Sequence, residues 1–148
     1  MGGSRKISTP QLPELLQQAF KILQGSMPGA RIDAIVDNWV YVWLPEIHFD
    51  GSKYPEPLKR GLWVRLPIQF PNVNPHGIVT QTPIAPVDGH PVKGHNPGHE
   101  TCKPVMGLGG QNYYSWTWTG ELGQGPQLSS SQDILAVVAW IERRIRNA

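Results

Sequence analysis

The residues best suited to chemistry lie in one segment between positions 90 and 102. His90, His95 and His99 precede Cys102, which is the only cysteine in the chain. A cysteine thiolate is a nucleophile and imidazole titrates near neutral pH, so this set could support acyl transfer. Cys102 stands among polar residues rather than aliphatic ones. We therefore expect an exposed, reactive thiol, with an ordinary surface cysteine as the alternative.

The same four side chains could instead bind zinc, which favours four nitrogen or sulfur ligands. Their spacing, H-x4-H-x3-H-x2-C, matches no standard zinc motif. The intervening Gly and Pro residues also provide no helix that would present the ligands together. We therefore expect neither a metal nor another cofactor, and keep zinc as an alternative.

A Cys–His hydrolase is a further alternative, in which Cys102 attacks an acyl substrate and one of the three histidines is the base. No oxyanion-hole motif accompanies the cysteine. Lys103 and Pro104 follow it, and this pair does not favour the start of a helix at that point. Neither feature supports the hydrolase.

The first predicted element of the fold that positions this segment is a helix. Apolar residues recur at three- and four-residue steps over residues 9–24, the period of an amphipathic helix. Ser8 or Thr9 can cap this helix, and Pro13 suits its first turn. Gly25 predicts its end. Residues 1–8 are expected to form a flexible N-terminus.

Four strands are predicted after this helix from runs of β-branched and aromatic residues. They cover residues 31–36, 38–44, 61–70 and 77–84. Asp37 and Asn38 predict a tight turn between the first two strands. Pro67 predicts an edge or a bulge in the third. Short links between consecutive strands indicate an antiparallel meander.

Residues 86–125 show no periodic pattern and are rich in Gly, Pro, His and Asn, so we expect a long irregular segment. Its aromatic side chains favour an ordered loop in which the rings pack rather than bind a ligand. These side chains are Tyr113, Tyr114, Trp116 and Trp118.

The last predicted element is a second helix at residues 130–146, with Ser130 and Asp133 similar to a capping box. The whole order predicts an α+β fold: an N-terminal helix, a four-stranded antiparallel meander, a long active-site loop and a C-terminal helix.

Composition narrows the function classes. The 148 residues suit a single domain covering 1–148, and 39% hydrophobic residues are enough for a core. A formal charge of +2 is too small to indicate nucleic acid or an anionic membrane as the partner. A single cysteine permits no intrachain disulfide, and no apolar run reaches the ~20 residues of a membrane span. A cytoplasmic protein is expected.

The order of elements and several short motifs resemble the ubiquitin-conjugating enzymes. In that family a helix and a four-stranded meander precede a long segment that holds the active cysteine. The 61–70 strand ends in Phe-Pro at 70–71, similar to the family's strand end. Residues 74–77 (NPHG) stand where the family has Tyr-Pro and further prolines. Residues 95–97 (HNP) are similar to the family's His-Pro-Asn motif, in another order.

Some features depart from the family pattern. Lys103-Pro104 replaces the usual Leu-Asp pair after the cysteine, and only one helix is predicted after it. These departures resemble the divergent bacterial relatives, some of which occur in antiviral defence systems. The resemblance implies three partners: an adenylating activating enzyme, a ubiquitin-like modifier and an acceptor protein.

The resemblance also implies roles for individual residues. Cys102 would accept the modifier as a thioester and pass it to an amine, and Lys103 would lower the pKa of the thiol. Asn96 would stabilise the oxyanion or its loop. His95 or His99 would deprotonate the incoming amine. The alternative from the same resemblance is a catalytically inactive binding module.

Overall fold

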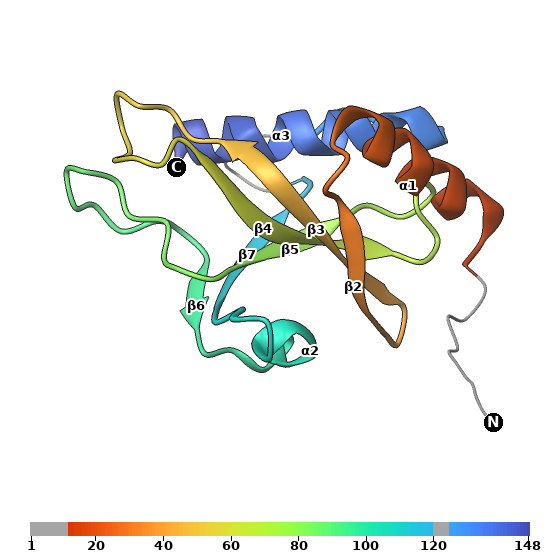
Figure 1. Cartoon of the computed structure of the whole chain (residues 1–148), viewed down its shortest axis with the longest axis horizontal. Coiled ribbons are helices and arrows are strands. Elements are labelled where there is room, and N and C mark those ends of the chain that lie inside the picture. The colour runs from red at the N-terminus through yellow and green to blue at the C-terminus, as the bar shows by residue number, and fades with distance from the viewer. Residues whose placement is uncertain (1–11, 120–124) are drawn as a thin grey trace.

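The computed structural model describes residues 12–119 and 125–148, and places them in an α+β arrangement around one antiparallel sheet (Figure 1). The order of its strands is β2-β3-β4-β5-β7-β6. In chain order the elements are α1 (Glu14–Ser26), β2 (Arg31–Val36), β3 (Trp39–His48), β4 (Lys59–Pro67), β5 (His76–Thr80), β6 (His95–Pro97), the 3₁₀ helix η1 (Glu100–Cys102), α2 (Lys103–Met106), β7 (Asn112–Thr117), the 3₁₀ helix η2 (Ser131–Asp133) and α3 (Ile134–Asn147).

The first four strands form the predicted meander. β2 has the expected bounds, whereas β3 extends four residues beyond the predicted end and β5 is shorter than predicted. Asp37 adopts a positive φ of 55° in the turn between β2 and β3, as a tight hairpin turn requires. Pro67 is the last residue of β4, and only Trp63 and Val64 of that strand pair with β5. Pro67 is therefore tolerated because that end of the strand is unpaired on one side.

The prediction of four strands and a long irregular segment is wrong, because the sheet has six strands. Residues 86–125 contain β6, η1, α2 and β7. β7 pairs with β5, and β6 then pairs with β7 at the sheet edge. The sequence NYYSWT of β7 is rich in strand-forming aromatic residues, but the Gly and Pro residues on both sides hide the pattern.

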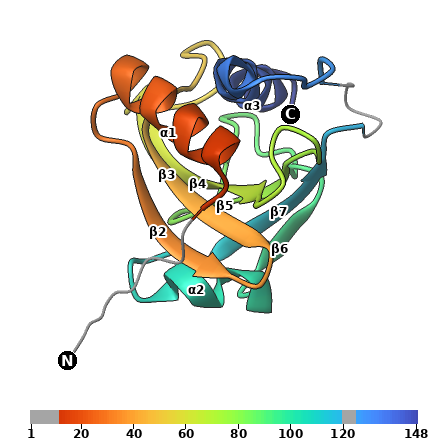
Figure 2. The ribbon, with the colours of Figure 1, turned by 90° about the vertical axis from the view of Figure 1, so that its right-hand side faces the viewer.

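Side-chain alternation along the strands separates two hydrophobic clusters, one on each face of the sheet. On β3, Val40 and Val42 belong to the larger cluster, which α1 and α3 cover, whereas Tyr41 between them belongs to the smaller one. On β7, Tyr114 belongs to the larger cluster and Tyr113 to the smaller. Figure 2 shows α1 and α3 together on one side of the sheet and α2 on the other.

The helix ends agree with the predictions in part. Pro13 is the N-cap of α1 rather than part of its first turn, and Gly25 lies inside the helix, which ends at Ser26. The predicted caps Ser8 and Thr9 and the predicted flexible N-terminus at residues 1–8 lie outside the described residues. Within the described part of the chain, no helix combines the length and the apolar character that crossing a membrane requires.

The predicted capping box at Ser130 and Asp133 is confirmed. The backbone N–H groups of Ser129 and Ser130 donate to Asp133 Oδ2 at 2.6 and 2.9 Å. The same bonds hold the pKa of Asp133 below its ordinary value of 3.8. The box therefore fixes where the chain enters α3, the helix that covers the larger core.

Removing this cap should weaken the fold measurably. We expect Asp133→Ala to lower the free energy of unfolding by about 1 kcal/mol, because two backbone donors lose their acceptor. The stabilisation should be present above pH 3.8 and disappear as the pH falls through the lower pKa of the folded state. Urea denaturation at several pH values measures both effects. Gln132→Ala, an exposed neighbour, is the control and should change little.

Candidate functional site

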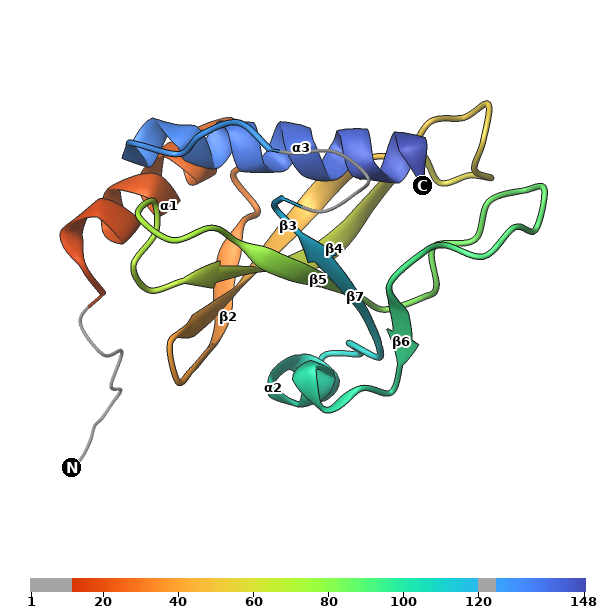
Figure 3. The ribbon, with the colours of Figure 1, turned by 180° about the vertical axis from the view of Figure 1, so that it is seen from behind.

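Cys102 is the last residue of η1 and the N-cap of α2, on the face of the sheet opposite α1 and α3. Its side chain is 0% exposed. It packs in the smaller cluster against aromatic and aliphatic side chains from four strands and α2. These are Tyr41, Trp63, Val79, Val105 and Tyr113. Figure 3 shows α2 below the sheet, between β2 and β6 in the view.

The expectation of an exposed thiol with a lowered pKa is wrong. Burial raises the pKa of the Cys102 thiol above its ordinary value of 9.0, because an apolar environment disfavours the charged thiolate. Lys103 does not offset this effect, since its side chain is exposed while that of Cys102 turns inward. His99, Glu100 and Lys103 are exposed while Cys102 between them is buried, so the polar residues around Cys102 in the sequence did not indicate its burial.

The expectation that Lys103-Pro104 would not begin a helix is also wrong. α2 begins at Lys103, with Pro104 in its first turn. A proline there loses no hydrogen bond, since the first N–H groups of a helix have no partner within it. Below the sheet, Tyr41 anchors the preceding turn through its hydroxyl, which donates to the Thr101 carbonyl at 2.8 Å. A β3 side chain thus fixes η1 over the sheet.

His95 lies on the other face of the sheet from Cys102. β6 pairs with β7 so that His95 stands opposite Tyr114 and Asn96 opposite Tyr113. The His95 ring stacks on Tyr114 with centroids 4.7 Å apart, and its Nε2 is 2.8 Å from Asn112 Oδ1. The sheet therefore stands between this imidazole and the thiol, and His95 cannot serve as the base for a reaction at Cys102 in this conformation.

Asn96 and His99 lie on the Cys102 face, but local backbone groups already engage them. Asn96 Nδ2 donates to the Gly94 carbonyl at 2.8 Å. His99 Nδ1 accepts from the Thr101 N–H at 3.1 Å, which makes His99 the cap of η1. Its ring also tilts over Tyr113, with centroids 5.0 Å apart. In this conformation both side chains hold the turns that lead to Cys102.

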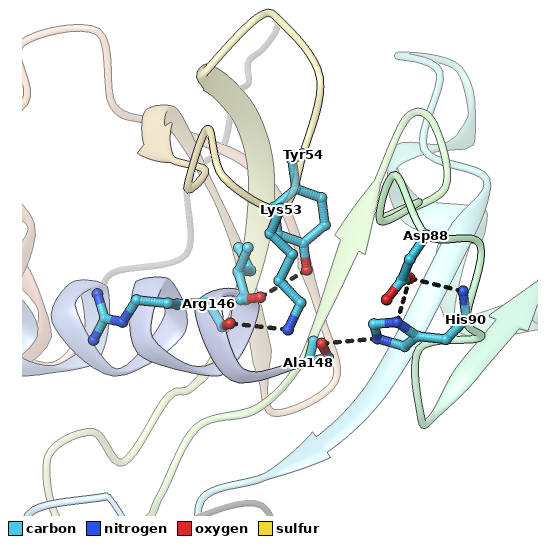
Figure 4. A network of polar contacts seen from close by, with 7 residues as sticks. Lys53, Tyr54, Asp88, His90, Arg146 and Ala148 are labelled. Carbon is cyan, nitrogen blue, oxygen red and sulfur yellow. Dashed lines mark hydrogen bonds and ion pairs between the residues drawn. The ribbon is translucent and has the colours of Figure 1, made fainter.

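His90 belongs to a separate network at the far end of α3 (Figure 4). Its Nδ1 lies 2.5 Å from Asp88 Oδ1, and its Nε2 lies 3.1 Å from the Ala148 main-chain oxygen. Lys53 contacts the Arg146 carbonyl nearby at 3.1 Å. This network joins the loop before β6 to the C-terminal helix. It leaves His90 remote from the environment of Cys102.

The four proposed zinc ligands are therefore not brought together. His95 faces Tyr114, His99 caps η1, His90 contacts Asp88, and the Cys102 sulfur lies in an apolar cluster. Over residues 12–119 and 125–148, the structure gathers no set of three His, Cys, Asp or Glu side chains that could hold a metal ion. The arrangement gives no support to the zinc alternative.

Arg65 is a residue of this face that the sequence analysis did not select. It lies over the Trp39 ring at 4.2 Å from the centroid and near the Tyr41 and Tyr113 rings at 5.8 and 5.7 Å. Burial and then the charge of Arg65 lower the pKa of His76, whose carbonyl accepts from Arg65 Nη1 at 3.1 Å. The alternation of side chains along β4 could have indicated this position, because Arg65 follows Trp63 by two residues and so lies on the same face.

The rings predicted to pack do so. Tyr113, Tyr114, Trp116 and Trp118 are all buried, and the indole N–H groups of Trp116 and Trp118 donate to backbone carbonyls. Their apolar bodies lie in the core while their polar atoms are satisfied, as large aromatic residues require in an interior.

Comparisons with known proteins add no family. No protein-family model, no curated protein and no solved structure matches this chain. The resemblance to ubiquitin-conjugating enzymes therefore rests on residues and on the order of elements.

Proposed function

We propose that this chain is a ubiquitin-conjugating-enzyme-like domain that binds a ubiquitin-like modifier and does not carry it covalently. The observation behind the proposal is the complete burial of Cys102 in an aromatic cluster. The order of α1, the strands β2 to β5 and the C-terminal α3 supports the likeness to the family. A binding role needs that framework and places no chemical demand on the cysteine.

Covalent transfer makes demands that this conformation does not meet. A thiolate must form and must reach the carbonyl carbon of an incoming thioester. Burial raises the pKa of Cys102 and covers its sulfur. A general base must also approach within hydrogen-bonding distance of the attacking amine. His95 lies across the sheet, and His99 Nδ1 is occupied by the Thr101 N–H.

The second candidate is the thioester carrier, favoured by the short elements around Cys102. η1 has three residues and α2 has four, so few backbone bonds would break if this corner opened. Asn96 and His99 lie on the same face and could then approach the sulfur. Such a carrier would act in a bacterial antiviral defence system, in the cytoplasm.

The carrier reaction would have two balanced steps. The Cys102 thiolate would attack the thioester of an adenylating activating enzyme, forming a new carbon–sulfur bond and releasing that enzyme's thiolate. An amine of the acceptor protein would then attack the Cys102 thioester, lose a proton and release the Cys102 thiolate. Both steps require an accessible sulfur.

One experiment distinguishes the binding domain from the thioester carrier. The protein is combined with an adenylating activating enzyme, a ubiquitin-like modifier and ATP, and the mixture is run on a non-reducing gel. We expect no thiol-sensitive band heavier by one modifier, although the activating enzyme itself becomes charged. Size-exclusion chromatography of the protein with free modifier should show a complex.

Cys102→Ala is the matched variant, with its circular dichroism compared with that of the wild type. The binding function predicts that the modifier complex survives the substitution. A thiol-sensitive band that this variant loses would establish the carrier. Absence of both the band and the complex would exclude both candidates.

A further inference from the structure

A cavity of about 480 Å³ lies beside the Cys102 cluster, between the β2–β3 turn and the η1–α2 corner. α2 contacts β2, and Figure 2 shows α2 next to the hairpin end. Trp39, Tyr41 and Arg65 line the cavity from the sheet, and Thr101 and Lys103 line it from the corner. Its volume lies in the range of small-molecule sites, about 300–1,000 Å³.

Arg65 has no carboxylate partner among the residues that the structure describes. Nη1 donates to the His76 carbonyl at 3.1 Å and lies 3.5 Å from the Tyr113 hydroxyl. Nε is buried without a hydrogen-bond partner. Among residues 12–119 and 125–148, no carboxylate lies within ion-pair distance of this guanidinium. Aromatic rings provide a weaker substitute for an anion than a carboxylate does, so the Arg65 guanidinium can still gain from binding one.

We propose that this cavity binds the carboxylate of a small organic acid through Arg65. A charge-assisted hydrogen bond from the guanidinium to a carboxylate oxygen would hold such an acid. The exposed Lys103 ammonium provides a second positive charge at the mouth. Trp39 and Tyr41 line the cavity beside Arg65 and provide aromatic surface for the rest of a small organic acid.

The charges at the mouth favour a monoanion over a phosphate. Asp37 and Glu100 also line the cavity, and both side chains are exposed. Their negative charges repel a dianion more strongly than a monoanion, although solvent screens the effect. A carboxylate therefore fits the charge balance better than inorganic phosphate. This inference is independent of the modifier-binding function.

The alkylation rate of Cys102 provides a second measure of ligand binding in this cavity. Thr101 and Lys103 line it and flank the cysteine in the chain. A ligand that contacts both residues should hold η1 and α2 against the sheet. Alkylation of the buried thiol, which requires this corner to open, should therefore slow several-fold when the cavity is filled.

The test is a titration of the ¹⁵N-labelled full chain with sodium benzoate, followed by NMR at constant ionic strength. We expect saturable shifts at the amides of Asp37, Thr101 and Lys103. Arg65→Gln should weaken benzoate binding by at least about tenfold, since the guanidinium contact is charge-assisted. Lys103→Glu, at an exposed position, should also weaken it and should not disturb folding.

Arg60→Gln is the matched control. Arg60 lies on the same strand and also over an aromatic ring, Phe49 at 4.2 Å, but does not line this cavity. Unsaturable shifts, or equal weakening by Arg60→Gln, would overturn the proposal. Equal binding of inorganic phosphate would overturn the preference for a carboxylate. If Arg65→Gln fails to fold, the test rests on two other results. The site would be rejected if Lys103→Glu bound benzoate as tightly as the wild type and benzoate did not slow the alkylation of Cys102 in the wild type.

Discussion

Native protein should react with iodoacetamide at Cys102 at least about 100-fold more slowly than protein unfolded in urea, because the reaction requires local opening. The thiol is fully buried, and burial raises its pKa. The native rate should therefore keep rising with pH beyond the ordinary thiol pKa of 9.0. Cys102 is the only cysteine, so mass spectrometry of the intact chain measures the rate.

Two tyrosine variants test the mechanism of protection. Tyr41→Phe removes the hydroxyl that anchors the Thr101 carbonyl, and should speed alkylation several-fold by loosening η1. Tyr54→Phe is the control, because it removes a similar bond, to the Ile145 carbonyl at 2.7 Å, at the end of α3. A native rate close to the unfolded rate would show that Cys102 is accessible in solution, and would favour the thioester carrier over the binding domain.

The largest loss of stability is expected from Trp63→Ala. Trp63 is 0% exposed and packs in the cluster that contains Cys102. Its ring lies against Trp43 with centroids 4.6 Å apart, and its Nε1–H donates to Asp33 Oδ2 at 2.7 Å. Truncation leaves a cavity, so we expect the free energy of unfolding to fall by about 3–5 kcal/mol in a urea titration.

Trp63→Phe separates packing from hydrogen bonding. This variant retains most of the aromatic body but removes the donor to Asp33, which still contacts Arg31 at 2.7 Å. We expect a loss of about 1–2 kcal/mol, well below that of the alanine variant. Equal losses in the two variants would show that the hydrogen bond, rather than ring packing, holds this face together. A loss below about 1 kcal/mol for Trp63→Ala would contradict the described cluster.

The sequence predicted the regular parts of the fold well. The meander strands and both long helices are visible in the sequence because their signals are local. An alternating strand or an amphipathic helix repeats its pattern within its own residues. The Ser130 and Asp133 capping box is local in the same way.

The segment from 86 to 125 was predicted poorly because its order depends on distant partners. β7 needs β5, which precedes it by more than thirty residues, and β6 needs β7. Gly and Pro residues around such strands resemble those of an irregular loop. The hydrogen bonds that stabilise these strands come from distant partners, and a local sequence pattern does not predict them.

The sequence by itself determined the two long helices, the strands of the meander and the chemical groups available near Cys102. The tertiary structure decided which of those groups meet. His95 and Asn96 are adjacent on β6 and therefore lie on opposite faces of the sheet, because side chains alternate along a strand. The fold also turned Cys102 inward beneath α2 and brought Arg65 to the cavity beside it. Both outcomes depend on contacts between strands far apart in sequence, which the composition around each residue does not report.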